Sequence, residues 1–401
     1  MTEHTEVVVI GGGYAGVMAA NRLTQRDDVT VTLINPRPRF VERIRLHQLV
    51  GGSHAAVVDY RQVLARSIRL VVDSATRINA AQRTVTLATG GTVGYDYLVY
   101  AVGSTSAAPR VPGAAEFAYP IATLEAAERL RAVLDATPAS AAVTVVGAGP
   151  TGIETAAELA ELGRTVTLVC GDVLGPYLHP RGRHAVADEL AALGVTVLQG
   201  PGATVTGVTR DAVRLSDGSV LPSAVTIWTA GFGVPDLARR SGLSTDAEGR
   251  LLTDETLTSV DDERVVAAGD SAAPSDLPFR MSCQAAGPLG VHAADTVLNR
   301  ITGQQPVPVA LGFVGQCISL GRRAGIFQFA HRDDTAKRLY VGGRPGAKLK
   351  QFVCWGTVKQ LALEARRPGS FFVPAFAADD KRRQLLQAEG HQRPVAASRA
   401  A

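Results

Sequence analysis

Apolar and polar positions along the chain repeat one pattern. The apolar run Val7–Ile10 is followed by a glycine-rich turn at 11–16, a helical run and a second apolar strand that ends at Asn35. A later run, Val143–Val146, begins the same series, with a glycine-rich turn at 147–152. Continuous apolar strands joined through a helix are typical of parallel strands buried on both faces. The pattern therefore predicts two similar βαβ units.

Other strands and helices complete the outline. Hairpin-like segments at 84–103 and 213–231 each lead into an apolar strand that ends in glycine, and a third apolar strand spans 265–270. After residue 306 come short strands and then a helix over 348–366. We predict an α/β fold with two Rossmann-like dinucleotide-binding domains and a smaller C-terminal α+β domain.

Composition excludes several classes of protein. Of 401 residues, 46% are hydrophobic and 19% are charged, which is typical of a globular protein. The net charge of +4 is too small to argue for nucleic acid as a partner. The four cysteines lie far apart without metal-ligand spacing, so we expect no metal site. No apolar run is long enough to span a bilayer and the N-terminus does not resemble a signal peptide, so we expect a cytoplasmic protein.

The glycine turns are candidate phosphate sites. Each follows an apolar strand and opens a helix, which is the context that gives a GxGxxG pattern its meaning. The first glycine makes the turn, the second lets a pyrophosphate approach the backbone, and the third lets helix and strand pack. Free N–H groups at the helix start then bind the phosphates. The residues predicted to do so are Gly11, Gly13, Tyr14, Ala15 and Gly16 in the first turn and Gly147, Gly149, Pro150, Thr151 and Gly152 in the second.

The acidic residue that usually binds the adenosine ribose is missing from both units. It is expected about 20 residues after the turn, where the first unit has Asn35 and the second has Cys170. The Asn35 amide oxygen still accepts a hydrogen bond, whereas a thiol is a poor acceptor. Asp172 is near enough to substitute. No Lys or Arg directly follows Cys170, so we favour NADH and keep NADPH open.

Four motifs together resemble the two-dinucleotide-binding-domain flavoproteins, the FAD/NAD(P)-dependent pyridine nucleotide oxidoreductases. They are Val-Ile-Gly-Gly-Gly-Tyr-Ala-Gly (9–16), the strand 97–103, Gly-Ala-Gly-Pro-Thr-Gly-Ile-Glu (147–154) and Ala-Gly-Asp (268–270). The resemblance implies FAD in the first turn and NADH or NADPH in the second. It adds further cofactor residues: Asn35, Arg43, Ala101, Gly103, Gly231, Gly269 and Asp270, of which Asp270 is expected to bind the ribityl chain of FAD.

The same resemblance implies domain bounds. We expect FAD-binding parts at 1–112 and 246–305, an NAD(P)H-binding domain at 113–245, a C-terminal domain at 306–376 and a flexible tail at 377–401.

Within that family the chain is most similar to type II NADH:quinone oxidoreductases. Their quinone-site motif, Ala-Gln-x-Ala-x-Gln-x-Gly, corresponds to residues 283–290, which keep Gln284, Ala286 and Gly290. Cys283 replaces the first Ala and Pro288 the second Gln, and the loss of that amide weighs against a quinone acceptor. Enzymes of this group attach to membranes through C-terminal helices. We weigh a membrane-surface contact for the run 352–363 and favour a packed core helix. A homodimer through the last domain stays open by analogy.

Three side chains are the catalytic candidates. The resemblance places Glu154 beside the nicotinamide and the acceptor, where we interpret it as orienting the carboxamide or relaying a proton. Gln284 lies in the first turn of a predicted helix whose positive end would stabilise reduced, anionic flavin. His47 falls where the chain passes the flavin and is interpreted as a donor or an acid, with a purely structural histidine as the alternative. Arg43 faces either the FAD pyrophosphate or solvent.

The resulting function is a FAD-dependent NAD(P)H dehydrogenase. Hydride would pass from the reduced nucleotide to the flavin, and two electrons would then pass to a small-molecule, quinone-like acceptor. Two alternatives stay open: a reductase of a small iron–sulfur protein, and an NADH-responsive flavin redox sensor.

Overall fold

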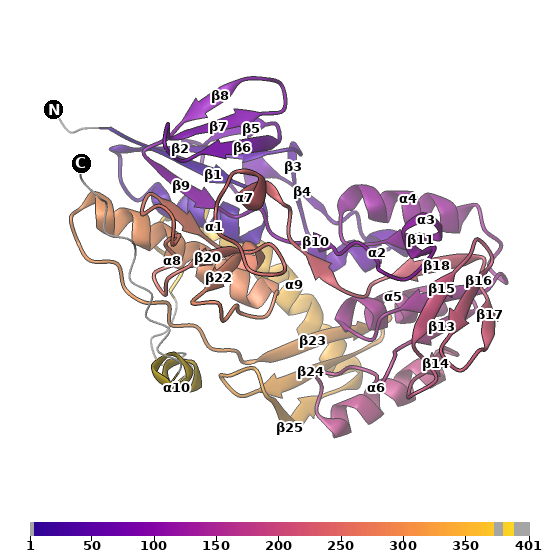
Figure 1. The fold of residues 1–401 in the computed structure, drawn as a ribbon. Coiled ribbons are helices and arrows are strands. Elements are labelled where there is room, and N and C mark those ends of the chain that lie inside the picture. The colour runs from indigo at the N-terminus through magenta and orange to yellow at the C-terminus, as the bar shows by residue number, and fades with distance from the viewer. Residues whose placement is uncertain (1–3, 373–379, 389–401) are drawn as a thin grey trace.

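A computed structural model describes residues 4–372 and 380–388, and it consists of two α/β lobes and a third unit that contacts both (Figure 1). The first lobe is built on a parallel sheet in the order β21-β9-β1-β2-β5. Its strands are β1 (Thr5–Ile10), β2 (Val29–Asn35), β5 (Arg69–Val72), β9 (Tyr97–Tyr100) and β21 (Val265–Ala267). The last of these comes from far along the chain and pairs with β9.

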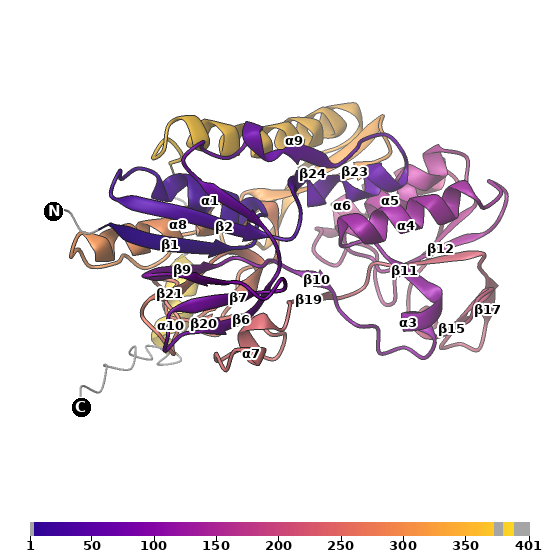
Figure 2. The same cartoon turned by 90° about the horizontal axis from the view of Figure 1, so that it is seen from above.

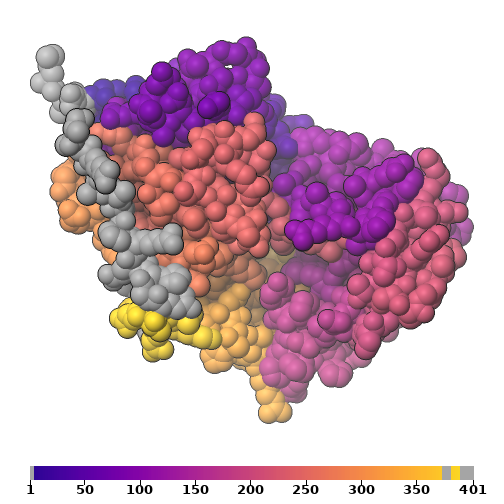
Figure 3. All heavy atoms as spheres, viewed as in Figure 1, coloured from indigo at the N-terminus to yellow at the C-terminus, as the bar shows by residue number. Residues whose placement is uncertain are grey.

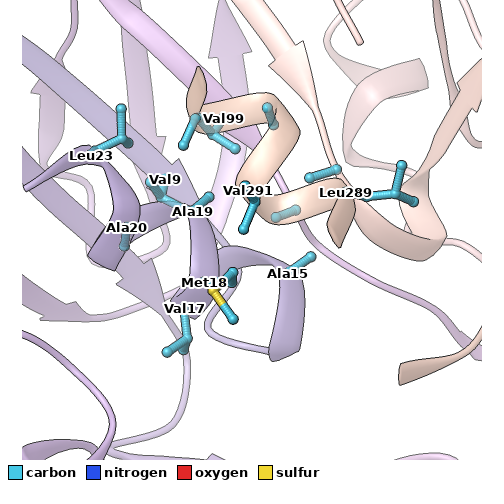
Figure 4. Packing of buried hydrophobic residues seen from close by; sticks show 14 of the residues in the cluster. Val9, Ala15, Val17, Met18, Ala19, Ala20, Leu23, Val99, Leu289 and Val291 are labelled. Atoms are coloured by element: carbon cyan, nitrogen blue, oxygen red, sulfur yellow. The ribbon is translucent and has the colours of Figure 1, made fainter. Parts of the chain in front are cut away.

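Both faces of the first sheet are covered, as the apolar runs require. Val7 and Val9 face the helices α1 (Tyr14–Leu23) and α8 (Cys283–Ile301), while Val8 belongs to the apolar cluster on the opposite face. Figure 4 shows side chains of α1 and α8 packed against one another beside this sheet. The two helices approach closely because α8 has Gly290 at the contact, where a Cβ would lie 2.4 Å from the Ala15 carbonyl oxygen.

The second lobe repeats the architecture. Its parallel sheet has the order β11-β18-β12-β13-β14. The strands are β11 (Ala118–Pro120), β12 (Val143–Val146), β13 (Val166–Val169), β14 (Thr196–Leu198) and β18 (Val225–Trp228), and the helices are α4 (Leu124–Asp135), α5 (Pro150–Glu161) and α6 (Pro180–Ala192). The short strands β10 (Thr105–Ser106) and β19 (Phe232–Gly233) pair antiparallel where the chain crosses between the lobes (Figure 2).

Each lobe carries a small antiparallel sheet where the hairpins were predicted. These are β6 (Ala75–Asn79), β7 (Thr84–Leu87) and β8 (Thr92–Gly94) in the first lobe, and β15 (Val205–Val208), β16 (Ala212–Leu215) and β17 (Val220–Pro222) in the second. The remaining short elements are β3 (Arg39–Val41), β4 (Val57–Asp59), β20 (Leu251–Thr253), β22 (Ala272–Pro274), α2 (Leu46–Val50), α3 (Ala114–Phe117), α7 (Leu237–Arg240) and the 3-10 turns η1 (Arg43–Arg45), η2 (Tyr60–Gln62) and η3 (Gly269–Ser271).

The third unit joins the lobes. It consists of an antiparallel sheet, β23 (Gly315–Leu320), β24 (Ala324–Ala330) and β25 (Ala336–Val341), followed by α9 (Gly343–Arg366). Helix α9 packs on α1 of the first lobe, whereas β23 packs on α5 of the second. This contact places side chains from all three units around one space. The α/β fold with two Rossmann-like lobes and a smaller α+β unit is confirmed.

Within the expected tail, residues 380–388 form the helix α10 (Asp380–Ala388), and the rest of 377–401 lies outside the described residues. On the face shown in Figure 3, α10 (yellow) lies against the orange part of the chain. Arg382 holds it there through Glu255, at 2.7 Å and 3.0 Å. Among the residues described, no helix combines the length and the apolarity needed to cross a bilayer.

Candidate active site

One large cavity lies where the three units meet. Its volume is about 1130 Å³, which exceeds the roughly 300–1,000 Å³ that is usual for one small ligand. Its walls include the first glycine turn, the start of α5, the start of α8 and the cavity side of α9. The space is therefore large enough for two ligands to meet.

The glycine turns have the shape that a dinucleotide requires. In the first, Gly11 has φ +105° and a Cβ there would lie 2.2 Å from the Ala101 carbonyl oxygen, while a Cβ at Gly16 would lie 1.8 Å from that of Gly11. Close packing therefore excludes any side chain at these two positions. Around Gly13, by contrast, no atom lies within 4 Å of the Cβ position. Open space beside the middle glycine is what an approaching pyrophosphate needs.

The second turn repeats these features. Gly147 has φ +124°, and a Cβ at Gly152 would lie 1.9 Å from the Gly147 carbonyl oxygen, whereas nothing surrounds the Cβ position of Gly149. Helix α5 begins directly after it at Pro150, where the missing N–H costs no helical hydrogen bond. The residues present thus fit two dinucleotides.

Asn35 and Cys170 differ in their ability to hydrogen-bond a ribose hydroxyl. The Asn35 side-chain oxygen accepts from the Gly12 N–H at 3.0 Å and its amide donates to the Arg37 carbonyl at 2.8 Å. Asn35 therefore already holds the first turn in shape while it lines the cavity. Burial raises the pKa of the Cys170 thiol to about 12, so this side chain is uncharged.

A polar cluster from the first lobe lines the cavity. Ser104 Oγ donates to Asp270 Oδ2 at 2.6 Å, Arg43 Nη1 donates to Ser104 Oγ at 2.9 Å, and Arg43 lies 3.6 Å from Asp270. Asp270 follows Gly269, whose φ of +69° turns the chain at the end of β21. The cluster leaves an oriented carboxylate beside the cavity, and Ser104 is a member that sequence reasoning missed.

Glu154 is the centre of a second, deeply buried cluster. Its Oε1 accepts from Lys350 Nζ at 2.7 Å and from the Ser319 N–H at 3.0 Å, and its Oε2 lies 3.4 Å from His47 Nδ1. Burial by itself raises the pKa of Glu154, but Lys350 and His47 outweigh it, so the pKa is lowered and the carboxylate is charged. Lys350 stays charged for the same reason, because Glu154 more than offsets its burial and raises its pKa.

Lys350 gave no signal in the sequence. It lies on α9, far along the chain from Glu154, within a stretch whose pattern predicts only a helix. It nevertheless lines the cavity together with Glu154 and His47, so the structure brings a buried ammonium group next to two predicted residues.

Gln284 ties the start of α8 to the third unit. With its amide oriented to satisfy both neighbours, it donates to the Gly315 carbonyl and accepts from the Val314 N–H, each at 2.8 Å. The N-cap of α8 is Ser282, which accepts from the Ala285 N–H at 3.2 Å. Burial raises the pKa of the adjacent Cys283 to about 12, so it is a neutral thiol. Among the described residues no group of His, Cys, Asp and Glu has the arrangement of a metal site.

Most of the predicted residues meet at this cavity. Those that line it are Gly11, Gly13, Tyr14, Ala15, Asn35, Arg43, His47, Ala101, Gly103, Pro150, Thr151, Glu154, Gly231, Asp270 and Gln284. Gly16, Gly147, Gly149, Gly152 and Gly269 are not among the lining residues and instead shape the turns.

Comparison with known proteins agrees with this geometry. Residues 5–294 match the model of the family described as pyridine nucleotide-disulphide oxidoreductase. A NADH dehydrogenase-like protein of Mycobacterium tuberculosis is 30% identical over 379 residues, which cover 87% of this chain and 93% of the relative. The type II NADH:quinone oxidoreductase of the same species is 29% identical over 345 residues, covering 75% and 73%.

A solved structure has the same fold. The sulfide:quinone oxidoreductase of Aquifex aeolicus superimposes with a TM-score of 0.76 over 96% of this chain and 95% of that chain, at 19% identity. The chain belongs to the pyridine nucleotide-disulphide oxidoreductase family. The prediction of a flavin-dependent NAD(P)H oxidoreductase, with FAD and a nicotinamide dinucleotide as cofactors, is confirmed.

Proposed function

We propose that this member of the pyridine nucleotide-disulphide oxidoreductase family is an NADH:quinone oxidoreductase. The observation that carries the proposal is the single cavity into which both lobes open and which the buried Glu154–Lys350 pair lines. FAD, when bound, supplies the redox chemistry that links a two-electron donor to an acceptor. The name of the mycobacterial type II relative supports a quinone as that acceptor.

Different groups of this chain would bind the two dinucleotides. The N–H groups after Gly13 at the start of α1 would hold the FAD pyrophosphate, and Asp270 would accept from a ribityl hydroxyl. The start of α5 would hold the second dinucleotide through Pro150 and Thr151, which line the cavity. Arg43 orients Asp270 through Ser104.

We assign the acceptor to the part of the cavity around Lys350. The neighbouring α9 residues Phe352 and Val353 also line the cavity and add apolar surface. A quinone has an apolar ring with two carbonyl oxygens, so it matches apolar walls with a hydrogen-bond donor. The Lys350 ammonium group is such a donor. Gln284 would position the start of α8 beside the same space.

The outer face of α9 supports a lipophilic acceptor. Phe352 and Trp355 are 63% and 53% exposed, and their ring centroids lie 5.7 Å apart. Lys359 lies over the Trp355 ring, and Lys348 is also exposed. The one acidic residue of α9, Glu364, is fully buried, so the exposed face carries only positive charge. Basic and aromatic residues on one helix face suit the surface of an anionic bilayer.

Helix α9 is therefore both a core helix and an exposed one. Cys354 and Leu361 are buried, as a packed helix requires, while Phe352 and Trp355 are exposed. The helix itself runs along one edge of the molecule (Figure 2). Sedimentation with vesicles tests the membrane contact. We expect binding to phosphatidylglycerol vesicles that is lost in Phe352→Ser/Trp355→Ser, and equal binding to phosphatidylcholine vesicles would contradict the charge argument.

Steady-state oxidation of NADH by the FAD-loaded enzyme tests the proposed function. We expect rapid turnover with short-chain quinones and a kcat/KM for NADH above that for NADPH, because no basic residue directly follows Cys170. Turnover that requires ferredoxin would instead support the iron–sulfur protein reductase. Flavin reduction without turnover by any acceptor would support the redox sensor.

A further inference from the structure

One ion pair connects the two lobes beside the cavity. Arg37 follows β2 in the first lobe, and Glu125 lies in the first turn of α4 in the second lobe. Arg37 Nε donates to Glu125 Oε1 at 2.5 Å, and Arg37 Nη2 donates to Glu125 Oε2 at 2.7 Å. A contact through both carboxylate oxygens fixes the distance between the two groups and their orientation. The ion pair therefore ties together two segments that belong to different lobes.

The pair borders the part of the cavity where the sequence places the adenosine of FAD. Arg37 lines the cavity, as do Thr123 and Leu124, which directly precede Glu125. The Arg37 carbonyl oxygen accepts from the side-chain amide of Asn35 at 2.8 Å. Asn35 occupies the position at which a dinucleotide-binding unit contacts the adenosine ribose. The ion pair and the predicted ribose contact are thus direct neighbours.

Both groups of the pair are charged at neutral pH. The hydrogen bond from Arg37 lowers the pKa of Glu125 to about 2, although burial acts in the opposite direction. The same hydrogen bond raises the pKa of Arg37. The side chains of Arg37 and Glu125 are nevertheless 31% and 48% exposed. Because solvent reaches the pair, salt screens it, and its strength depends on the ionic strength.

Apolar packing joins the lobes independently of this pair. Leu46 and Leu49 of α2, in the first lobe, belong to one buried cluster with Leu130 of α4. This packing does not involve the charged groups, so it keeps the lobes together when the ion pair is broken. Opening of the pair then releases only the start of α4 and the segment after β2, at the edge of the cavity.

We propose that the Arg37–Glu125 pair is a clasp that closes the cavity over the adenosine half of FAD and slows the release of this cofactor. Arg37 and Glu125 are positioning residues, because they act by holding the cavity edges of the two lobes together. This inference rests on the proposed binding of FAD at the first glycine turn and is independent of the electron acceptor.

Three variants test the clasp. Arg37→Gln and Glu125→Gln each remove one charge and keep a polar side chain. The double variant Arg37→Glu/Glu125→Arg restores an ion pair with the charges exchanged. The control is Arg61→Gln, which breaks the exposed Arg61–Asp59 pair within the first lobe, at residues that are not among those lining the cavity.

The first measurement is the rate at which bound FAD leaves the protein. After free cofactor is removed, timed ultrafiltration and the absorbance of the retained flavin give this rate. We expect about fivefold faster release from Arg37→Gln and from Glu125→Gln, and release near the wild-type rate from the double variant and the control. At about 0.5 M KCl, release from the wild type should approach that from the single variants, because salt screens a partly exposed pair.

The second measurement is hydrogen exchange in the FAD-bound proteins. Residues 124–127, at the start of α4, should exchange faster in both single variants than in the wild type. Residues 130–134 should exchange at the wild-type rate, because their packing against α2 is retained. Faster exchange along the whole of α4 would show that the pair holds the lobes together in general, and would overturn the clasp.

The release rates also decide against the clasp in two other cases. Wild-type rates in both single variants would refute it. Faster release from Arg37→Gln alone, not restored in the double variant, would show that Arg37 binds FAD directly and would refute it as well. Wild-type protein that takes up no FAD would refute the placement of FAD and the clasp with it, whereas failure of quinones to reoxidise the flavin would refute only the proposed acceptor.

Discussion

At the scale of single residues, burial makes His47 sensitive to acid. In the unfolded chain its pKa is near the ordinary value of 6.5, while in the folded protein burial lowers the pKa to about 4. Between these two values the unfolded state binds more protons than the folded state. The free energy of unfolding therefore falls as the pH falls through this window.

This linkage predicts a specific effect of His47→Asn on acid stability. From about pH 7 to about pH 4 the wild type should lose about 3 kcal/mol more of its free energy of unfolding than the variant, since the variant has nothing to titrate there. Urea unfolding at a series of pH values measures the difference. Equal losses in the two proteins would show that His47 is not held neutral.

The glycines of each turn are required for different reasons. Gly16 is required by packing, because a Cβ there would lie 1.8 Å from the Gly11 carbonyl oxygen, whereas the space beside Gly13 and Gly149 is open. The φ values of Gly13 and Gly149 are −85° and −75°, which any residue can adopt. A side chain at either position would thus meet only a ligand.

At the scale of elements, we therefore expect one substitution in each glycine turn to weaken the binding of the cofactor that belongs to that turn. Gly13→Val should fold but purify without flavin, while Gly149→Val should keep its flavin and show a KM for NADH raised by about tenfold or more. Absorbance of bound flavin and steady-state kinetics measure these effects. Gly16→Ala is the contrasting variant, and it should lose stability even without cofactor. Normal flavin content in Gly13→Val would argue against the assigned turn.

Helix α10 is attached through Arg382, which is buried, and through Lys381, which pairs with Asp333 at 3.0 Å. Arg382 is 9% exposed, donates to the Pro274 carbonyl oxygen at 2.9 Å, pairs with Glu255 and lies over the Phe279 ring at 4.3 Å. Phe279 also lines the cavity, so α10 reaches the rim of the site.

Removing that anchor should release the helix. In Arg382→Ala, hydrogen exchange of residues 380–388 should accelerate by about tenfold or more, because the isolated helix is too short to persist. Gln384→Ala, on the exposed side of α10, should exchange like the wild type. Mass-spectrometric hydrogen exchange measures both, and unchanged protection in Arg382→Ala would show that other contacts hold α10.

At the scale of the whole molecule, the third unit is joined to the second lobe by apolar packing and buried ion pairs. Ile318 and Ile326 pack in one cluster with Ile153 of α5. Beside them, Lys350 pairs with Glu154, and Arg322 pairs with Glu158 at 2.8 Å. The catalytic candidates are therefore also part of an interface, and a change at either residue acts on stability as well as on chemistry.

A double-mutant cycle should reveal this dual role. Lys350→Met leaves the Glu154 carboxylate buried without its cation and should lower the free energy of unfolding by about 3–5 kcal/mol. Glu154→Gln in that background removes the buried charge and should restore most of the loss. Urea unfolding at neutral pH measures all four proteins, and additive effects would show that the two residues do not interact.

The sequence by itself determined the two lobes and their turns. The strand, the glycine turn and the helix that follows it are adjacent in the sequence. The apolar run and the glycines at 11–16 therefore predict the turn, and a phosphate group as its ligand, without knowledge of any long-range contact. For Asp270 the sequence by itself predicts only a carboxylate at the end of a strand, and its role toward FAD is what the family resemblance implies. These features depend on short-range sterics and on the ends of helices, which neighbouring residues specify.

Only the tertiary structure decided how the acceptor side is built. Lys350, Glu154 and His47 come from three helices far apart along the chain, and their separation in space depends on how β23 and α9 pack against both lobes. From the sequence alone, a single Lys in a helix is expected to be solvated. The tertiary structure instead buries Lys350 beside the Glu154 carboxylate, where it lines the cavity. Proton chemistry at this site is thus a property of packing, because long-range contacts determine which charges are desolvated together.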